Sequence, residues 1–216
     1  MEPCPPALSR HPCWAVVPVK RLRWAKSRLA RALRAEQRAA LARAGLARTL
    51  DVLAEVEHIV RVIVVTSDLT AQKLAVAKRA AALAETGSGL NAAVSEACEW
   101  AAAQGAPAAL IVPTDLPLLT AWDIRAMIGL AAEPACVVLA PDRHEAGTNA
   151  MLLKPPQVLQ PAFGPASLET HRRRARSAGL TVHIYRSPTI ELDLDWPADL
   201  DRYHAVAALD ALSLYE

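Results

Sequence analysis

Aromatic residues are scarce in this chain of 216 residues, which holds five Trp, three Tyr and one Phe. Apolar residues nevertheless make up 53% of the sequence, so a core of ordinary size must be built from Ala, Val, Leu and Ile. No stretch approaches the ~20 uninterrupted apolar residues of a membrane-spanning helix. We therefore expect a globular protein without a membrane partner.

Strong charge of either sign is also missing, because 24 Lys and Arg residues nearly balance 22 Asp and Glu residues. A net charge of +2 argues against a nucleic-acid partner held by a broad basic face. Cysteine is rare as well, and the four that occur have neither metal-type spacing nor a paired pattern. The thiols are therefore expected to be reduced, in the cytoplasm.

Motifs for nucleophilic catalysis are absent, since no Ser or Cys has a plausible His partner and no helix carries a His-x-x-x-His metal pair. Residues 1–13 contain four prolines and lack the apolar segment of a signal peptide. This segment is expected to form a flexible N-terminal arm. Residues 14–216 should form one domain, because no repeat or linker divides them.

Short, uniformly apolar runs alternate with helix-forming segments along this domain. We expect strands at residues 14–19, 60–65, 108–112, 136–139, 148–153 and 180–185. Helices are expected at residues 24–33, 35–56, 70–82, 91–104, 121–132, 167–178 and 197–212. Strands that are apolar throughout are typical of a mostly parallel sheet with helices on both faces. The sequence therefore predicts a single-domain, Rossmann-like α/β fold.

Polar residues follow the expected strands, and parallel sheets bind ligands beyond the carboxyl ends of their strands. We therefore expect one rim to carry Lys20, Asp68, Gly87, Asp115 and Asp142.

The first such loop is basic and contains no glycine, with Lys20, Arg21, Arg23, Lys26 and Arg28. The missing glycine excludes a Walker loop and a dinucleotide fingerprint, which need close backbone approach to phosphate. The loop could be a solvated start to a helix. Cations are unfavourable at the positive end of a helix dipole, however, so a bound polyphosphate is the favoured interpretation.

Three aspartates are candidate ligands of a divalent cation. Asp115 follows an apolar strand, and Asp193 and Asp195 are two residues apart, so an extended segment directs both to one side. Mg²⁺ usually takes one or two protein carboxylates together with substrate oxygens. The alternatives are helix capping by Asp115, for which Thr120 is better placed, and by Asp195 at the 197–212 helix.

Two further loops remain open between binding and capping. The loop at residues 86–91 could wrap a nucleobase, with the Asn91 amide reading its edge, or Asn91 could cap the following helix. The loop at residues 163–167 could bind an anion at a helix start, although capping by Ser167 is preferred from the residues alone. The basic run at residues 171–176 spreads around a helix and is expected to be solvated surface.

Six short stretches carry a resemblance to a known family when they are taken together. They are Val17–Lys20 with Ala25–Leu29, Gly89–Ala93, Thr114–Pro117, Gly147–Ala150, Phe163–Ser167, and Asp193–Asp195 with Pro197–Leu200. In this order they resemble the 2-phospho-L-lactate guanylyltransferases, which include relatives acting on phosphoenolpyruvate or 3-phospho-D-glycerate. That family lies within the molybdopterin-cofactor nucleotidyltransferase-like folds, of the nucleotide-diphospho-sugar transferase type.

The resemblance implies an enzyme that joins GMP from GTP to the phosphate of a three-carbon acid and releases pyrophosphate, in coenzyme F-420 biosynthesis. It implies that Mg²⁺ is held by Asp115, Asp193 and Asp195, and the acid by Thr148, Gly164 and Ser167. The nucleotide would be bound by Val17, Lys20, Lys26, Gly87, Gly89 and Asn91. Lys20, Lys26 and Arg28 would hold the phosphates and act in catalysis.

The chain departs from the family at Trp196, where a small residue such as Thr is expected, and in its N-terminal arm. Other interpretations stay open: a nucleotidyltransferase using CTP or a molybdopterin acceptor, a glycosyltransferase with an Asp-x-Asp motif, or a GTP-binding module without catalysis. The sequence does not choose among the three acids, and a homodimer is one assembly that it allows.

Overall fold

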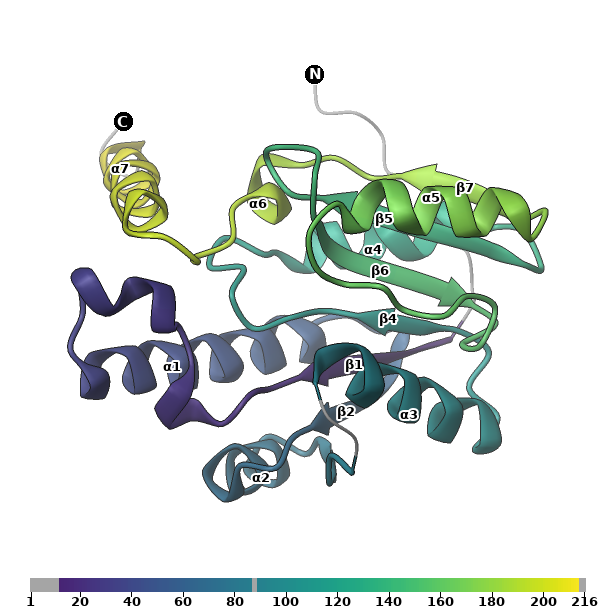
Figure 1. Ribbon diagram of the computed structural model, residues 1–216, viewed down its shortest axis with the longest axis horizontal. Coiled ribbons are helices and arrows are strands. Elements are labelled where there is room, and N and C mark those ends of the chain that lie inside the picture. Colours follow the sequence, from purple (N-terminus) through teal and green to yellow (C-terminus); the bar gives the residue numbers. More distant parts are fainter. Residues whose placement is uncertain (1–11, 87–88, 214–216) are drawn as a thin grey trace.

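The computed structural model describes residues 12–86 and 89–213, with residues 207–213 described by their backbone alone. A seven-stranded sheet with the order β3-β2-β1-β4-β6-β5-β7 forms its centre (Figure 1). The strands are β1 (Cys13–Pro18), β2 (Ile59–Val65), β3 (Ala81–Leu83), β4 (Ala109–Ile111), β5 (Cys136–Pro141), β6 (Thr148–Lys154) and β7 (Thr181–Ile184). In the described chain only β6 runs antiparallel to its neighbours. The predicted α/β fold is confirmed.

Helices cover both faces of this sheet (Figure 1). They are α1 (Ala35–Ala54), α2 (Leu69–Ala77), α3 (Leu90–Ala103), α4 (Ala121–Leu130), α5 (Ser167–Ser177), α6 (Pro188–Glu191) and α7 (Pro197–Ser213). Successive strand residues point to opposite faces. Ala15 and Val17 of β1 accordingly lie in the core that includes α1 and α4, whereas Trp14 and Val16 lie in the core that includes α3 and α5.

The helix predicted at residues 24–33 is wrong. The chain there forms two short 3-10 segments, Leu22–Trp24 and Ser27–Arg31. Lys26 lies between them in the left-handed region, at φ 55°, which interrupts any continuous right-handed helix. Leu22 and Leu29 are buried and anchor the segment, so its shape is set by packing rather than by helix propensity.

The helix predicted at residues 70–82 ends earlier, at Ala77, and a strand was missed after it. Arg79 adopts φ 61°, which stops the helix. Residues Ala81–Leu83 then pair with β2 as the edge strand β3. Alanine favours a helix when no partner is present, so only the pairing with β2 makes this segment a strand. The short helix α6 was also not predicted.

The ends of the remaining elements follow local chemistry. Asp68 caps α2 by accepting from the backbone N–H groups of Thr70 and Ala71. Thr120 caps α4 in a reciprocal pair with Asp123, as its position predicted. Cys13 is already part of β1 and is buried, so the sheet begins one residue before the predicted boundary. Pro12 is exposed, and residues 1–11 of the predicted arm lie outside the described residues.

The antiparallel direction of β6 matters for the site. Because β6 runs against β4 and β5, its first residue, Thr148, lies at the same edge of the sheet as the carboxyl ends of the parallel strands. Lys20, Asp115 and Asp142 lie just beyond the ends of β1, β4 and β5. The described residues contain no helix of the length and apolarity required to cross a membrane.

Candidate functional site

Two cavities open at this edge of the sheet and meet. The first, of about 460 Å³, is lined by Lys20, Lys26, Glu85 and Gly89, and we call it the basic cavity. The second, of about 410 Å³, is lined by Arg143, Thr148, Ser167 and Asp193, and we call it the hydroxyl cavity. Both are lined by Pro18, Arg28, Leu90, Pro113, Asp115, Gly164 and Asp195. The shared residues make the cavities two halves of one cleft.

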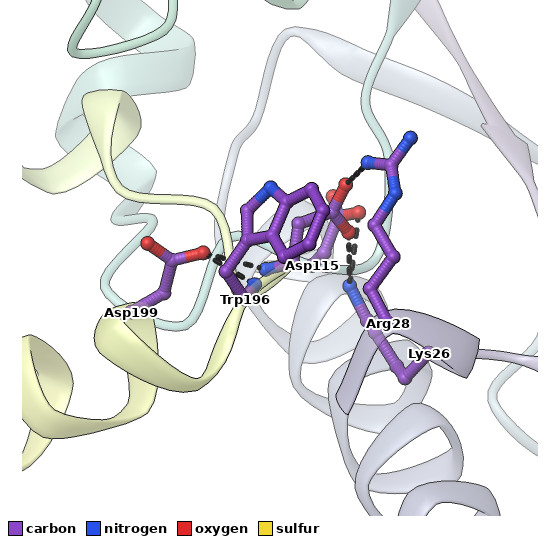
Figure 2. Close-up of polar contacts among 6 residues, drawn as sticks. Lys26, Arg28, Asp115, Trp196 and Asp199 are labelled. Atoms are coloured by element: carbon purple, nitrogen blue, oxygen red, sulfur yellow. Dashed lines mark hydrogen bonds and ion pairs between the residues drawn. The ribbon is translucent and has the colours of Figure 1, made fainter. Parts of the chain in front are cut away.

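Charged groups converge where the two halves meet (Figure 2). Lys26 Nζ lies 3.0 Å from Asp115 Oδ2 and 3.5 Å from Asp195 Oδ1. Arg28 donates to Asp195 Oδ2 at 2.6 Å. The Lys26 side chain is only 9% exposed, and its left-handed backbone costs of order 1 kcal/mol. Lys26 thus combines an uncommon backbone conformation with a largely buried ion pair.

The predicted three-carboxylate set is not assembled as a group of metal ligands. Among residues 12–86 and 89–213, no group of three His, Cys, Asp or Glu side chains is arranged to hold a metal ion. Lys26 Nζ lies instead within ion-pair distance of both Asp115 and Asp195. Asp193 lies near both, and burial together with their negative charges raises its pKa to about 6. The site thus retains uncompensated negative charge beside an ion pair.

The two aspartates that pair with Lys26 have no capping role. Asp115 does not cap α4, since Thr120 does. Asp199, rather than Asp195, accepts from the backbone N–H groups of Asp195 and Trp196, at 2.9 and 2.7 Å, and so orders the start of α7 (Figure 2). The carboxylates of Asp115 and Asp195 therefore face the cleft.

The basic loop is fixed from outside the cleft. The Leu22 backbone N–H donates to Asp68 Oδ2 at 2.9 Å, so the residue that caps α2 also holds the loop. Arg21 and Arg23 stack on the ring of Trp24, which leaves Lys20, Lys26 and Arg28 as the cations that line the cavity. The predicted choice of these three is consistent with this arrangement, although their role in catalysis stays a prediction.

Two predicted nucleotide residues, Val17 and Asn91, do not present side chains to the basic cavity. The side chain of Val17 is fully buried in the core, so only its backbone could contact a ligand. Gly87 lies outside the described residues. Asn91 does not cap α3, where Gly89 is the N-cap. Instead, Asn91 Oδ1 accepts from the Phe163 backbone N–H at 2.7 Å, and Asn91 Nδ2 donates to the Phe163 carbonyl at 3.0 Å. Gly89 does line the cavity.

The hydroxyl cavity is built on tight turns. A Cβ at Gly147 would lie 2.8 Å from Asp142 Oδ2, so the Asp142 carboxylate would have to shift. That carboxylate accepts from two backbone N–H groups of the same turn. Gly164 adopts φ 138°, which side chains rarely tolerate. Ser167 is buried at the start of α5 and makes no capping bond, so the capping role preferred from sequence is wrong.

Two residues of the hydroxyl half, His171 and Arg143, were not predicted from the sequence. His171 belongs to the run expected to be solvated, yet it is fully buried and contacts Thr148 Oγ1 at 3.0 Å. Arg143 lines the hydroxyl cavity and lies 2.8 Å from the buried Asp199 Oδ1. The signal for His171 is its spacing from Leu168 and Ala175, which places all three on the buried face of α5.

Comparison with known proteins decides the family. The family description "Guanylyl transferase CofC like" matches residues 13–204. The chain belongs to this family. It is 42% identical to a phosphoenolpyruvate guanylyltransferase from Rubrobacter xylanophilus, over 89% of this chain and 93% of that protein. It is 33% identical to a 2-phospho-L-lactate guanylyltransferase from Methanothermobacter thermautotrophicus, over 86% of this chain and 81% of that protein.

A solved structure supports the fold assignment. A nucleotidyl transferase from Methanothermobacter thermautotrophicus superposes with a TM-score of 0.65 at 13% identity, over 88% of this chain and 95% of that chain. At that identity the likeness shows the fold alone. Together with the family match, it confirms the predicted resemblance, and the protein is a nucleotidyltransferase of the guanylyltransferase family.

Proposed function

We propose that the protein transfers GMP from GTP to the phosphate of a three-carbon phospho-acid and releases pyrophosphate. Phosphoenolpyruvate is the acid we favour, because the relative at 42% identity carries that name and the 2-phospho-L-lactate enzyme is more distant, at 33%. As the family resemblance implies, the product would serve coenzyme F-420 biosynthesis. The observation that carries the proposal is a cleft whose basic and hydroxyl halves meet at Asp115 and Asp195.

The basic cavity suits GTP. Lys20, Lys26 and Arg28 supply cations for its phosphate oxygens. Glu85 lines the same cavity and has no partner among the described residues. A carboxylate only accepts hydrogen bonds, and the Watson–Crick edge of guanine offers two neighbouring donors, which adenine and cytosine do not. Glu85 therefore replaces Asn91 as the side chain we assign to the guanine base.

The hydroxyl cavity suits the phospho-acid. Thr148 and Ser167 offer hydroxyl donors, and the Gly164 turn brings backbone close to a ligand. Arg28 and Arg143 offset the charge of a carboxylate and a phosphate. These partners differ from the long cations of the basic cavity, so the two halves are suited to different anions.

The chemistry needs no general base, because a phosphate monoester is largely ionised at neutral pH, with a second pKa of about 6. An oxygen of the acceptor phosphate attacks the α-phosphorus of GTP, and the bond from that phosphorus to the bridging oxygen breaks, so pyrophosphate leaves. Lys26 and Arg28 hold the reacting phosphates and offset their charge. The cleft also aligns the two anions for attack, which lowers the barrier further.

The carboxylates would hold a divalent cation once Lys26 released them. Asp115 and Asp195 already converge on one positive group, and Asp193 adds unpaired negative charge nearby. Mg²⁺ accepts one or two protein carboxylates and completes its shell with phosphate oxygens and water. When bound, it would neutralise charge on the triphosphate. Lys26 would then exchange its aspartate partners for phosphate oxygens.

The reactants also suit the cell interior. GTP and phospho-acids are cytoplasmic metabolites, and the described cysteines, Cys13, Cys98 and Cys136, are free and buried, as expected in a reducing compartment.

The test is pyrophosphate release measured with each of GTP, ATP, CTP and UTP against phosphoenolpyruvate, 2-phospho-L-lactate and 3-phospho-D-glycerate, with Mg²⁺ and then with a chelator. We expect turnover with GTP and phosphoenolpyruvate that the chelator abolishes. A clear preference for CTP, or GTP binding without pyrophosphate release from any acid, would contradict the proposal.

A further inference from the structure

His171 is a fully buried histidine on α5 with both ring nitrogens engaged. Its Nδ1 lies 3.0 Å from Thr148 Oγ1, and its Nε2 accepts from the Ala162 backbone N–H at 2.9 Å. The ring also packs edge-on against Phe163, with 5.3 Å between centroids. His171 therefore connects the first residue of β6 to the loop that leads into the Gly164 turn.

The contact with Ala162 fixes the tautomer of His171. A backbone N–H only donates, so Nε2 must present its lone pair, and the hydrogen of the neutral ring lies on Nδ1. A protonated ring would place two N–H groups against each other. Burial, with a smaller contribution from the charge of Arg174, lowers the pKa of His171 to about 4, which agrees with a neutral ring. Nδ1–H therefore donates to Thr148 Oγ1.

This donation determines which way the Thr148 hydroxyl points. With one lone pair occupied by His171, its own hydrogen is available for another acceptor. The structure provides no acceptor for that hydrogen among the described residues. Thr148 lines the hydroxyl cavity. A ligand oxygen in that cavity can therefore accept from Thr148, and ionised phosphate and carboxylate oxygens only accept.

We propose that His171 is a positioning residue for the acceptor acid. It holds the Thr148 hydroxyl as a hydrogen-bond donor toward an anionic oxygen in the hydroxyl cavity, and it holds Ala162 so that the Gly164 turn keeps its place beside the same ligand. The inference rests on the proposed function, which supplies the phosphorylated acid as the anion.

Two substitutions separate the two contacts of His171. In His171→Gln the side-chain oxygen can take the place of Nε2 and accept from Ala162, while the donor to Thr148 is lost. In His171→Asn the amide nitrogen can take the place of Nδ1 and donate to Thr148, while the contact with Ala162 is lost. Arg173→Ala is the control, because Arg173 is exposed on the same helix.

Steady-state kinetics with GTP and phosphoenolpyruvate then distinguish positioning from support of the fold. His171→Gln should raise KM for the acid about tenfold, as expected for one lost bond to a charged group, and leave KM for GTP unchanged. His171→Asn should raise KM for the acid by a smaller factor. Because His171 acts through Thr148, the double variant His171→Gln/Thr148→Val should be no worse than Thr148→Val alone. The inference would be overturned if His171→Gln and His171→Asn lowered kcat equally and left KM for both substrates unchanged. It would also be overturned if the effects of His171→Gln and Thr148→Val on KM for the acid were additive in the double variant.

An independent readout comes from the unmodified protein. Nitrogen-15 NMR of the histidine rings should show His171, assigned by its loss in His171→Gln, as a neutral ring protonated on Nδ1 at pH 7. A ring protonated on Nε2 would overturn the inference. Failure of the proposed function would look different, since the wild-type protein would release no pyrophosphate with any of the three acids.

Discussion

The two halves of the cleft are built in opposite ways. The basic cavity uses long cationic side chains on an irregular loop that contains two short 3-10 segments, and Lys20 and Arg28 are exposed. The hydroxyl cavity uses short, buried hydroxyls at the ends of regular elements, with Thr148 fixed by His171. Long cations can follow a triphosphate as it reacts, whereas fixed short donors suit one small acid. Ligand binding in the basic cavity would therefore depend mainly on charge, and ligand binding in the hydroxyl cavity mainly on the fixed positions of its donors.

The largest effect is expected where the halves meet. Asp115→Asn should lower kcat about a thousandfold, because it removes a charge that both Lys26 and a divalent cation would use. Thermal unfolding should change little, since the Asp115 side chain is partly exposed. Asp51→Asn, which removes an exposed surface partner of Lys78, is the matched control. Wild-type turnover in a folded Asp115→Asn protein would show that the junction is not the reaction centre.

A backbone contact behind the junction offers a second test. A Cβ on Gly45 of α1 would collide with the Thr114 carbonyl, next to Asp115. Helix propensity alone predicts that Gly45→Ala stabilises the protein by about 0.5–1 kcal/mol. The close contact predicts the reverse, a loss of about 1–3 kcal/mol in urea unfolding together with lower kcat. Stabilisation with normal kcat would show that the loop carrying Asp115 can move freely.

A pH-dependent effect should distinguish the two halves. Asp193 lines only the hydroxyl cavity, and its pKa is raised to about 6 from its ordinary value of 3.8. The folded protein therefore ionises Asp193 less readily than the unfolded chain does. The free energy of unfolding falls as the pH rises from 3.8 to about 6. Without divalent cation, Asp193→Asn should stabilise the protein at pH 8 by about 1–2 kcal/mol and not at pH 4, as urea unfolding would show. An equal effect at both pH values would contradict this.

The same group should couple metal binding to pH. Activity titrated with Mg²⁺ should need more metal below pH 6, where Asp193 takes up a proton, and that dependence should weaken in Asp193→Asn.

The smallest effect is expected at Trp196. Its ring lies 5.2 Å from the Arg28 guanidinium (Figure 2), where a small residue was expected from the family resemblance. A partly exposed cation–π contact is worth about 0.5–1 kcal/mol. Trp196→Thr should therefore raise KM for GTP about two- to fivefold and leave KM for the acid near its wild-type value. A larger change in KM for the acid would assign Trp196 to the hydroxyl half.

The sequence predicted the elements whose pattern is local. Uniformly apolar strands and most helices were found as expected, including Thr120 as an N-cap. It failed where partners distant in the chain decide the conformation. The strand at 81–83 depends on pairing with β2. Lys26, at φ 55°, forms ion pairs with Asp115 and Asp195, which lie far away in the chain. Neither interaction is visible in the neighbouring residues.

The candidate site divides in the same way. Lys20, Lys26, Asp115 and Thr148 were predicted because they follow strand ends or match family stretches, and all four line the cleft. The commitment of the Asn91 amide to Phe163 and the burial of His171 depend on how α3 and α5 approach one loop. The spacing of Leu168, His171 and Ala175 predicts that His171 is buried, but not that it contacts Thr148 and Ala162.

The most direct test of two separate half-sites compares one variant from each. KM for GTP and KM for phosphoenolpyruvate would be measured in Lys20→Ala and in Thr148→Val. The structure predicts that Lys20→Ala raises only KM for GTP, about tenfold, and that Thr148→Val raises only KM for the acid by a similar factor. If both variants raise the same KM, the two cavities are not separate donor and acceptor sites.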